Sequence, residues 1–168
     1  ASPWIADEIS RFPVLLDEML NAQTLFAPPG KAELDAELRQ ALVRLPEDDL
    51  EAQMEALRIF KKGHVLRVAA SDIKGTLPLM KVSDYLTWIA EAVLEEVLWL
   101  AWRDLTSRHG VPYRTDGTPC NPDFVVIGYG KLGGLELGYG SDLDLVFIHD
   151  AAHDGETDGA RAVDNATF

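Results

Sequence analysis

Apolar residues recur three and four residues apart along the first two thirds of the chain, which is the spacing of one helix face. This pattern predicts a helical region over 3–21, a helix over 31–45, a helix that starts within 46–49 and continues to about 70, and a long helix over 83–108. Pro13 interrupts the first region, so we expect two short helices or one kinked helix there. Asp48 and Glu51 match a capping box at the start of the third. His64 has no evident partner, so we expect a packed or solvent-facing histidine.

Only the stretch 124–150 has the pattern of a sheet. An apolar run at 124–127 is followed by six glycines and then by Asp142 and Asp144, one residue apart. Successive side chains of a strand point to opposite faces, so the two aspartates would share one face and the apolar residues after them the other, core-facing side. The sequence therefore predicts a predominantly helical α+β fold, with an N-terminal helical bundle followed by the first strands of a sheet.

Asp142 and Asp144, about 7 Å apart on one strand face, indicate a metal site. Two neighbouring carboxylates raise each other's pKa when they are buried, and a divalent cation removes that cost. Aspartate oxygens suit Mg²⁺ or Mn²⁺, which bind through one or two carboxylates together with water and substrate phosphates. The pair is typical of half of a phosphoryl-transfer site.

The glycines before the aspartates indicate a phosphate-binding turn. Gly130, Gly133 and Gly134 follow the apolar run, where a chain leaving a strand can present backbone N–H groups to phosphate oxygens. Lys131 adds a mobile cation, and Ser141 offers a hydroxyl just before the aspartates.

Two other phosphate motifs do not fit this stretch. Gly128, Gly130 and Gly133 spell the G-x-G-x-x-G of dinucleotide-binding folds, but that fold needs a crossover helix of about a dozen residues between parallel strands. The later Gly138 leaves room for only about one helical turn. The G-K-[ST] ending of a Walker loop is also missing from the sequence. A solvent-facing hairpin whose aspartates only keep a sheet edge soluble is the remaining alternative.

The glycine turn followed by Ser-Asp-Leu-Asp-Leu resembles the nucleotidyltransferase superfamily related to DNA polymerase β. The strings GYGKLGGLELGYGSDLDLVFIHD and GTLPLMKVSDYLTWIAEA resemble, more narrowly, the bifunctional family of glutamine synthetase adenylyltransferases and adenylyl-removing enzymes. These strings are closer to the C-terminal, adenylylating half of that family, and the similarity runs from about Arg11 to Asp150. Lys131 is a departure, because the superfamily usually has Gly or Ser there.

This resemblance implies an enzyme that transfers AMP from ATP to a tyrosine of glutamine synthetase and so regulates nitrogen assimilation. It implies that Asp142 and Asp144 hold the metal ions, while the turn from Gly130 to Gly134, with Lys131 and Ser141, holds the phosphates. A PII-type signalling protein is an implied further partner. The third carboxylate of the family lies in a later string that this sequence does not contain, so we expect the chain to be inactive alone.

Two alternatives stay open. The chain could belong to the de-adenylylating half, in which phosphate replaces tyrosine as the attacking group. It could also be a helical interaction module in which residues 1–109 dock a protein partner.

Composition narrows the class of protein. Lys+Arg 15 against Asp+Glu 28 gives a net charge of −13, which opposes nucleic-acid binding. Cys120 is the only cysteine, so no internal disulfide forms, and the sequence contains no run of about 20 apolar residues that could span a membrane. We therefore expect a cytoplasmic protein, and the start at Ala1 indicates a segment of a longer polypeptide. The expected divisions are a helical region at 1–110, a linker at 111–122, the start of a catalytic core at 123–150 and an acidic tail at 151–168.

Overall fold

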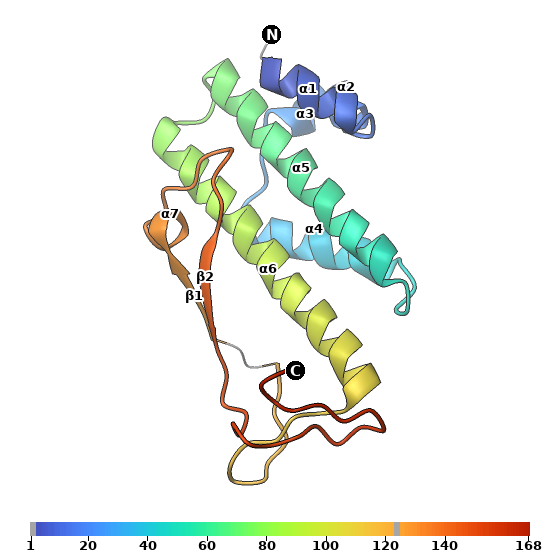
Figure 1. Ribbon diagram of the computed structural model, residues 1–168. Helices are drawn as coiled ribbons and strands as arrows, with labels where there is room; N and C mark the ends of the chain where they lie inside the picture. The colour runs from blue at the N-terminus through green and yellow to red at the C-terminus, as the bar shows by residue number, and fades with distance from the viewer. Residues whose placement is uncertain (1–2, 123–124) are drawn as a thin grey trace. The chain divides into compact units, whose positions relative to one another are not determined.

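The computed structural model describes residues 3–122 and 125–168, and the chain forms two compact units (Figure 1). The helical unit consists of Ala1–Leu94 and Gly134–Asp142, and the sheet unit of Glu95–Gly133 and Leu143–Phe168. Helices with one small two-stranded sheet confirm the predicted helical α+β class. Phe124, the first residue of the predicted apolar run, and Asp123 lie outside the described residues.

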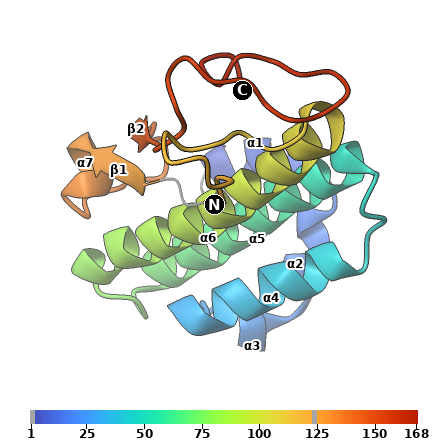
Figure 2. The ribbon, with the colours of Figure 1, turned by 90° about the horizontal axis from the view of Figure 1, so that it is seen from below.

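The helical unit is built around α5. Its helices are α1 (Pro3–Arg11), α2 (Leu15–Leu20), α3 (Ala22–Leu25), α4 (Lys31–Val43), α5 (Leu50–Lys74) and the first half of α6 (Leu79–His109). Helices α2, α3 and α4 all contact α5, and the first half of α6 runs alongside it in both views (Figures 1 and 2). The break between α1 and α2 confirms the predicted interruption at Pro13. Within the described residues, none of the helices combines the length and the hydropathy that crossing a bilayer requires.

Local chemistry fixes both ends of α5. The side chain of Asp49 accepts a hydrogen bond from the backbone N–H of Ala52 at 2.9 Å, so the prediction of Asp48 as the cap was wrong by one residue. At the other end Gly75 adopts a φ of 74°, the left-handed conformation that closes a helix. The helix therefore continues four residues past Ala70. Polar residues after Ala70 obscure the apolar periodicity but do not end the helix, whereas Gly75 does.

Leucines from three helices form a core at the centre of the helical unit. Leu15 of α2, Leu25 of α3 and Leu66 of α5 are between 2% and 6% exposed. Partly buried side chains from α1, the neighbouring turns and α5 pack against them: Ile5, Ile9, Phe12, Phe26 and Ala70. Fully burying one such side chain contributes roughly 1.5–3 kcal/mol, so this cluster is what holds the short N-terminal helices on α5.

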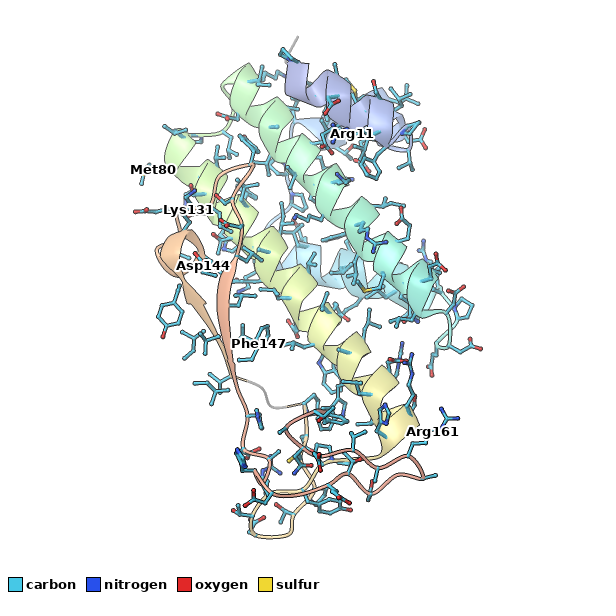
Figure 3. The ribbon with its side chains drawn as sticks, in the orientation of Figure 1. Arg11, Met80, Lys131, Asp144, Phe147 and Arg161 are labelled. Carbon is cyan, nitrogen blue, oxygen red and sulfur yellow. The ribbon has the colours of Figure 1, made fainter. Side chains whose placement is uncertain are left out.

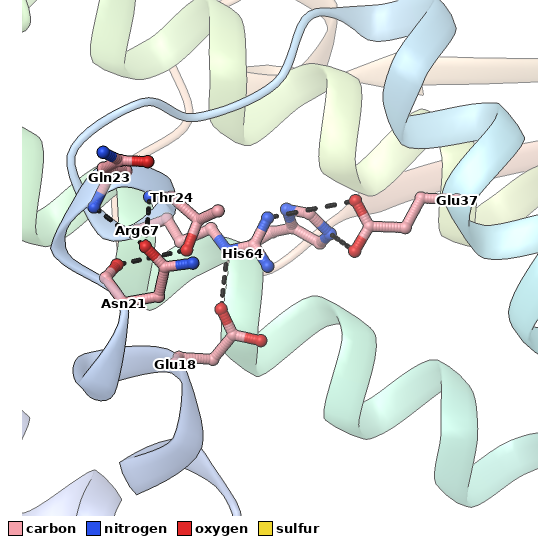
Figure 4. A network of polar contacts seen from close by, with 7 residues as sticks. All are labelled: Glu18, Asn21, Gln23, Thr24, Glu37, His64 and Arg67. Carbon is pink, nitrogen blue, oxygen red and sulfur yellow. Dashed lines mark hydrogen bonds and ion pairs between the residues drawn. The ribbon is translucent and has the colours of Figure 1, made fainter.

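A polar network joins α2, α4 and α5 beside this core (Figure 4). Arg67 of α5 donates from Nε to Glu18 Oε2 at 2.7 Å, and its Nη1 lies 3.9 Å from Glu37 Oε2. Glu37 Oε1 in turn lies 3.4 Å from Nε2 of His64, which is only 3% exposed. Burial, and then the charge of Arg67, lower the pKa of His64 to about 3, so the histidine is packed and neutral at pH 7.

The sheet unit contains one antiparallel pair of strands. β1 (Val125–Tyr129) pairs with β2 (Asp144–Ile148) in a register that runs from Val125↔Ile148 to Tyr129↔Asp144, and the single-turn helix α7 (Gly130–Gly133) follows β1 directly. Antiparallel pairing confirms that no dinucleotide-binding βαβ unit forms here. The face predicted to be core is largely exposed: Leu145 is half-buried, but Leu143 is 37% and Phe147 49% exposed. That prediction was wrong because two strands alone provide no second layer to cover the apolar face.

The segment 151–168 is more organised than the solvated loop that its composition predicts. Asp158 accepts hydrogen bonds from the backbone N–H of Val111 at 2.7 Å and from the hydroxyl of Tyr113 at 2.9 Å. These donors, the backbone one first, lower the pKa of the Asp158 carboxyl. Thr157 and Asn165 in the same segment are buried. Asp158 is exposed, as predicted, but its hydrogen bonds also fix the loop after α6, which the composition did not predict.

The buried His64 makes stability depend on pH. Its folded-state pKa of about 3 lies below the model-compound value of 6.5, so the unfolded chain binds a proton first as the pH falls. Stability is complete above pH 6.5 and is lost as the pH falls toward 3. From pH 7 to pH 5 we expect a loss of about 2 kcal/mol attributable to this residue.

Urea unfolding of the protein and of His64→Gln at both pH values measures that loss as a difference. The non-titrating variant should lose about 2 kcal/mol less than the parent protein over this interval. Equal losses in the two proteins would contradict the assignment of a buried neutral histidine.

Candidate functional site

Asp144 lies against the glycine turn that follows β1 (Figure 3). The strand register places Asp144 opposite Tyr129, the residue before Gly130. A Cβ atom added to Gly130 would lie 2.5 Å from Oδ2 of Asp144, and Gly130 has a φ of +55°. The left-handed conformation favours glycine at this position, and the missing side chain leaves room for the Asp144 carboxylate beside the backbone.

The two other glycines of the turn are required by its packing. A Cβ on Gly133 would lie 2.4 Å from the carbonyl oxygen of Gly128, and one on Gly128 would lie 2.9 Å from the side chain of Leu132. Leu132 is only 9% exposed. The glycines therefore allow a tight junction between the strand and the turn. This is a second role beside the predicted exposure of backbone N–H groups.

The turn presents cationic and donor groups. Lys131 is exposed and forms no ion pair with the other residues that the structure describes. It is the second residue of α7, and N–H groups in the first turn of a helix have no partner within the helix. Figure 3 shows Lys131 and Asp144 at the α7 turn. The structure thus brings together Gly130, Lys131, Gly133 and Asp144 of the predicted site.

The remaining predicted residues, Gly134, Ser141 and Asp142, belong to the helical unit. Ser141 closes a turn, because its Oγ accepts from the N–H of Gly138 at 2.9 Å and its own N–H donates to the Gly138 carbonyl at 3.1 Å. Asp142 is exposed and precedes β2, which begins only at Asp144. Strand alternation therefore does not fix the direction of the Asp142 side chain, and the predicted shared face with Asp144 does not follow from it.

Asp142 and Asp144 suit a hard cation as donors. Both are exposed carboxylates, and Mg²⁺ is bound in many phosphoryl-transfer sites by one or two carboxylates with substrate phosphates completing its shell. Across residues 3–122 and 125–168, no three His, Cys, Asp or Glu side chains gather as a complete metal site. The residues present fit a metal ion that is shared with a phosphate ligand.

Sequence reasoning missed a long-range contact beside these residues. The hydroxyl of Tyr139 donates to Oδ2 of Asp72 on α5 at 2.9 Å. Burial, and then this hydrogen bond, raise the pKa of the Tyr139 phenol well above its ordinary value. The available signal was an aromatic residue enclosed by Gly138 and Gly140, in a turn that otherwise has no reason to contain one.

Comparisons with known proteins cover the whole chain. The profile of the glutamate-ammonia ligase adenylyltransferase family matches residues 1–168. A bifunctional glutamine synthetase adenylyltransferase/adenylyl-removing enzyme of Pseudomonas aeruginosa is 68% identical over 168 residues, and proteins of the same name from Pseudomonas syringae pv. tomato and Shewanella frigidimarina are 68% and 55% identical. The matches cover 100% of this chain but only 17–18% of those relatives.

Replacing Gly133 by alanine should open the strand-to-turn junction. The new Cβ would meet the backbone of Gly128 at 2.4 Å, and overpacking of this kind costs about 1–3 kcal/mol. Amide hydrogen exchange of β1 and β2 should accelerate in Gly133→Ala.

Gly140→Ala is the matched control, because a Cβ there meets nothing within 4 Å. It should leave exchange in the two strands unchanged. Equal protection of the strands in both variants would show that the junction is not as tightly packed as described.

Proposed function

The chain belongs to the glutamate-ammonia ligase adenylyltransferase family, and from this premise we propose that it supplies part of the active site that transfers AMP from ATP to a tyrosine of glutamine synthetase. The approach of the Asp144 carboxylate to the bare backbone of Gly130 is the observation that supports this most directly. A carboxylate beside unpaired backbone donors can recognise a metal-bound phosphate from two sides.

In this proposal Asp142 and Asp144 hold Mg²⁺ or Mn²⁺. The metal supplies charge stabilisation to the phosphoryl oxygens during transfer. Both aspartates are exposed, so substrate can reach them without displacing core residues. The proposal assigns the site to the polymerase β-like nucleotidyltransferases, for which the resemblance implies a third carboxylate that this sequence does not contain. We expect the chain alone to show no turnover.

In this proposal the α7 turn binds the β- and γ-phosphates, while the reaction takes place at the α-phosphorus. The N–H groups of Gly130, Lys131 and Leu132 donate to phosphate oxygens, and the Lys131 side chain adds a mobile positive charge. Ser141 keeps its hydroxyl hydrogen available, because the hydrogen bond from Gly138 occupies only an acceptor site of Oγ. These groups orient the triphosphate so that its α-phosphorus is presented to the incoming tyrosine.

The transfer step forms one bond and breaks one. The tyrosine oxygen attacks the α-phosphorus, the bond to the bridging oxygen of the β-phosphate breaks, and pyrophosphate leaves while the phenolic proton is released. The chain's share of catalysis is positioning and electrostatic stabilisation, which are the main contributions in phosphoryl transfer.

A second activity belongs to the same family. The relatives' name includes adenylyl removal, in which phosphate attacks the tyrosine-bound AMP instead. The greater resemblance of the glycine turn and upstream helix to the adenylylating half supports transfer for this segment. A PII-type regulatory partner and a cytoplasmic location are further parts of this proposal.

The helical unit adds a docking hypothesis. Exposed apolar side chains lie along α2, where Leu16 is 49%, Met19 43% and Leu20 83% exposed. Such side chains favour contact with another protein surface over contact with water. Co-purification of α2 variants with glutamine synthetase would separate this role from that of the aspartates.

The proposed site is tested in a full-length enzyme that contains this segment. Asp144→Asn and Asp142→Asn keep the side-chain shape but remove the charge, so each should lower AMP transfer to glutamine synthetase by about 100-fold or more, as expected when several kcal/mol of charge stabilisation is lost. Mass spectrometry of the modified tyrosine measures the transfer, and circular dichroism checks the fold.

Asp154→Asn serves as the matched control, because its side chain is fully exposed in the acidic segment and should not affect transfer. Near-normal transfer by the Asp142→Asn/Asp144→Asn double variant would reject the role of the pair. Loss of phosphorolysis with intact transfer would assign the segment to the removing activity instead.

A further inference from the structure

Nine residues, Gly134 to Asp142, belong to the helical unit, although the residues before and after them belong to the sheet unit, and they form neither helix nor strand. Three of them are glycine, the residue that loses most backbone freedom on folding. Ordering each residue costs about 1–2 kcal/mol of conformational entropy, so a defined path for this segment needs specific contacts. The proposed function needs a defined path, because the segment ends on Ser141 and Asp142.

The structure shows where those contacts are. Leu137 is only 4% exposed, which buries the middle of the segment. Two residues later the Tyr139 hydroxyl donates to Asp72 at 2.9 Å, across 67 positions of sequence. The turn between Gly138 and Ser141 is then closed by two hydrogen bonds of 2.9 and 3.1 Å.

The backbone of the segment is also held in an uncommon conformation. Leu135 has a φ of 55° although it is not glycine, and its side chain is 55% exposed. A branched residue in the left-handed region persists only where surrounding contacts impose it. The contacts that follow, at Leu137 and Tyr139, are those that fix the chain.

Asp72, which accepts the hydrogen bond from Tyr139, belongs to a long helix. Asp72 lies in the last turn of α5, three residues before Gly75 ends the helix. The Tyr139 ring also lines a small cavity with Lys61, Lys62 and Leu66 from the same helix. Tyr139 therefore lies beside α5, and its hydroxyl is bound by Asp72 of that helix.

We propose that Tyr139 and Asp72 are positioning residues for the adenylyl transfer, holding the Ser141–Asp142 segment on α5 so that the Asp142 carboxylate has a fixed place. Neither touches the reacting atoms. This inference rests on the proposed function, since it assigns Asp142 the metal-binding role described above. The helical unit then contributes to catalysis through α5.

The experiment uses a full-length enzyme that contains this segment, with Tyr139→Phe and Asp72→Ala as the disrupting variants. Both should lower kcat for AMP transfer about tenfold and raise the Mg²⁺ concentration needed for half-maximal activity, with the KM for glutamine synthetase unchanged. The double variant should be no worse than either single one, because both remove the same hydrogen bond. Asp72→Asn keeps an acceptor oxygen and should recover most of the activity.

Tyr85→Phe is the matched control, because the Tyr85 ring packs against Trp88 and its hydroxyl is not paired with an aspartate in the described structure. It should leave kcat and the metal requirement unchanged. A second readout does not depend on activity: amide hydrogen exchange at Gly138 to Asp142 should become about tenfold faster in Tyr139→Phe and stay the same in Tyr85→Phe.

The outcomes separate this inference from the proposed function. Unchanged exchange and unchanged kcat in Tyr139→Phe overturn the positioning role, whatever Asp142→Asn does. Faster exchange with a normal kcat and metal requirement also overturns it, because the contact would then be structural only. Faster exchange in Tyr139→Phe together with full activity in Asp142→Asn shows instead that the proposed function has failed, while the tether itself is real.

Discussion

The close approach of the Asp144 carboxylate to Gly130 is the constraint on which the candidate site depends. The antiparallel register places Asp144 opposite the last residue of β1, and the chain turns away at once with a left-handed glycine. A side chain at position 130 would be strained by the left-handed φ and would displace the Asp144 carboxylate, since its Cβ would lie 2.5 Å from Asp144 Oδ2. The Asp144 carboxylate therefore lies beside the backbone N–H groups of the α7 turn. A metal-bound phosphate requires this combination of groups.

The helical unit has an internal organisation of its own. Its own stability comes from the leucine cluster on α5 and from the Arg67 network that joins α2, α4 and α5. The same α5 carries Asp72, which binds Tyr139 three residues before Asp142. One long helix thus organises both the packing of the N-terminal helices and the path of a segment that carries a candidate ligand.

Periodicity predicted the helices well, because buried leucines at spacings of three and four leave a pattern that needs no knowledge of distant residues. It failed at their ends, where Asp49 instead of Asp48 caps α5 and Gly75 sets its last turn. The glycines after the apolar run, together with the aspartates that follow them, were enough to predict the turn after β1. The Tyr139–Asp72 contact could not be predicted from the sequence, since it joins positions 67 residues apart and depends on how the chain folds back on α5.

The exposure of the sheet face was mispredicted, and the hydrogen bonds of Asp158 were not predicted, for a related reason. Alternation along a strand predicts which residues share a face, but burial of that face needs a second layer, and Leu143 and Phe147 remain exposed. Acidic composition predicts solvation, yet Asp158 is held by donors from Val111 and Tyr113. Both outcomes depend on tertiary neighbours that composition does not contain.

The most direct measurement is the anomalous diffraction of Mn²⁺ in crystals of a full-length enzyme that contains this segment, grown with a non-hydrolysable ATP analogue. The account predicts a Mn²⁺ peak within about 2.0–2.3 Å of carboxylate oxygens of Asp142 and Asp144, with phosphate oxygens facing the backbone of Gly130 to Gly133. A bound nucleotide whose metal is coordinated elsewhere, with Asp144 remote from its phosphates, would contradict it.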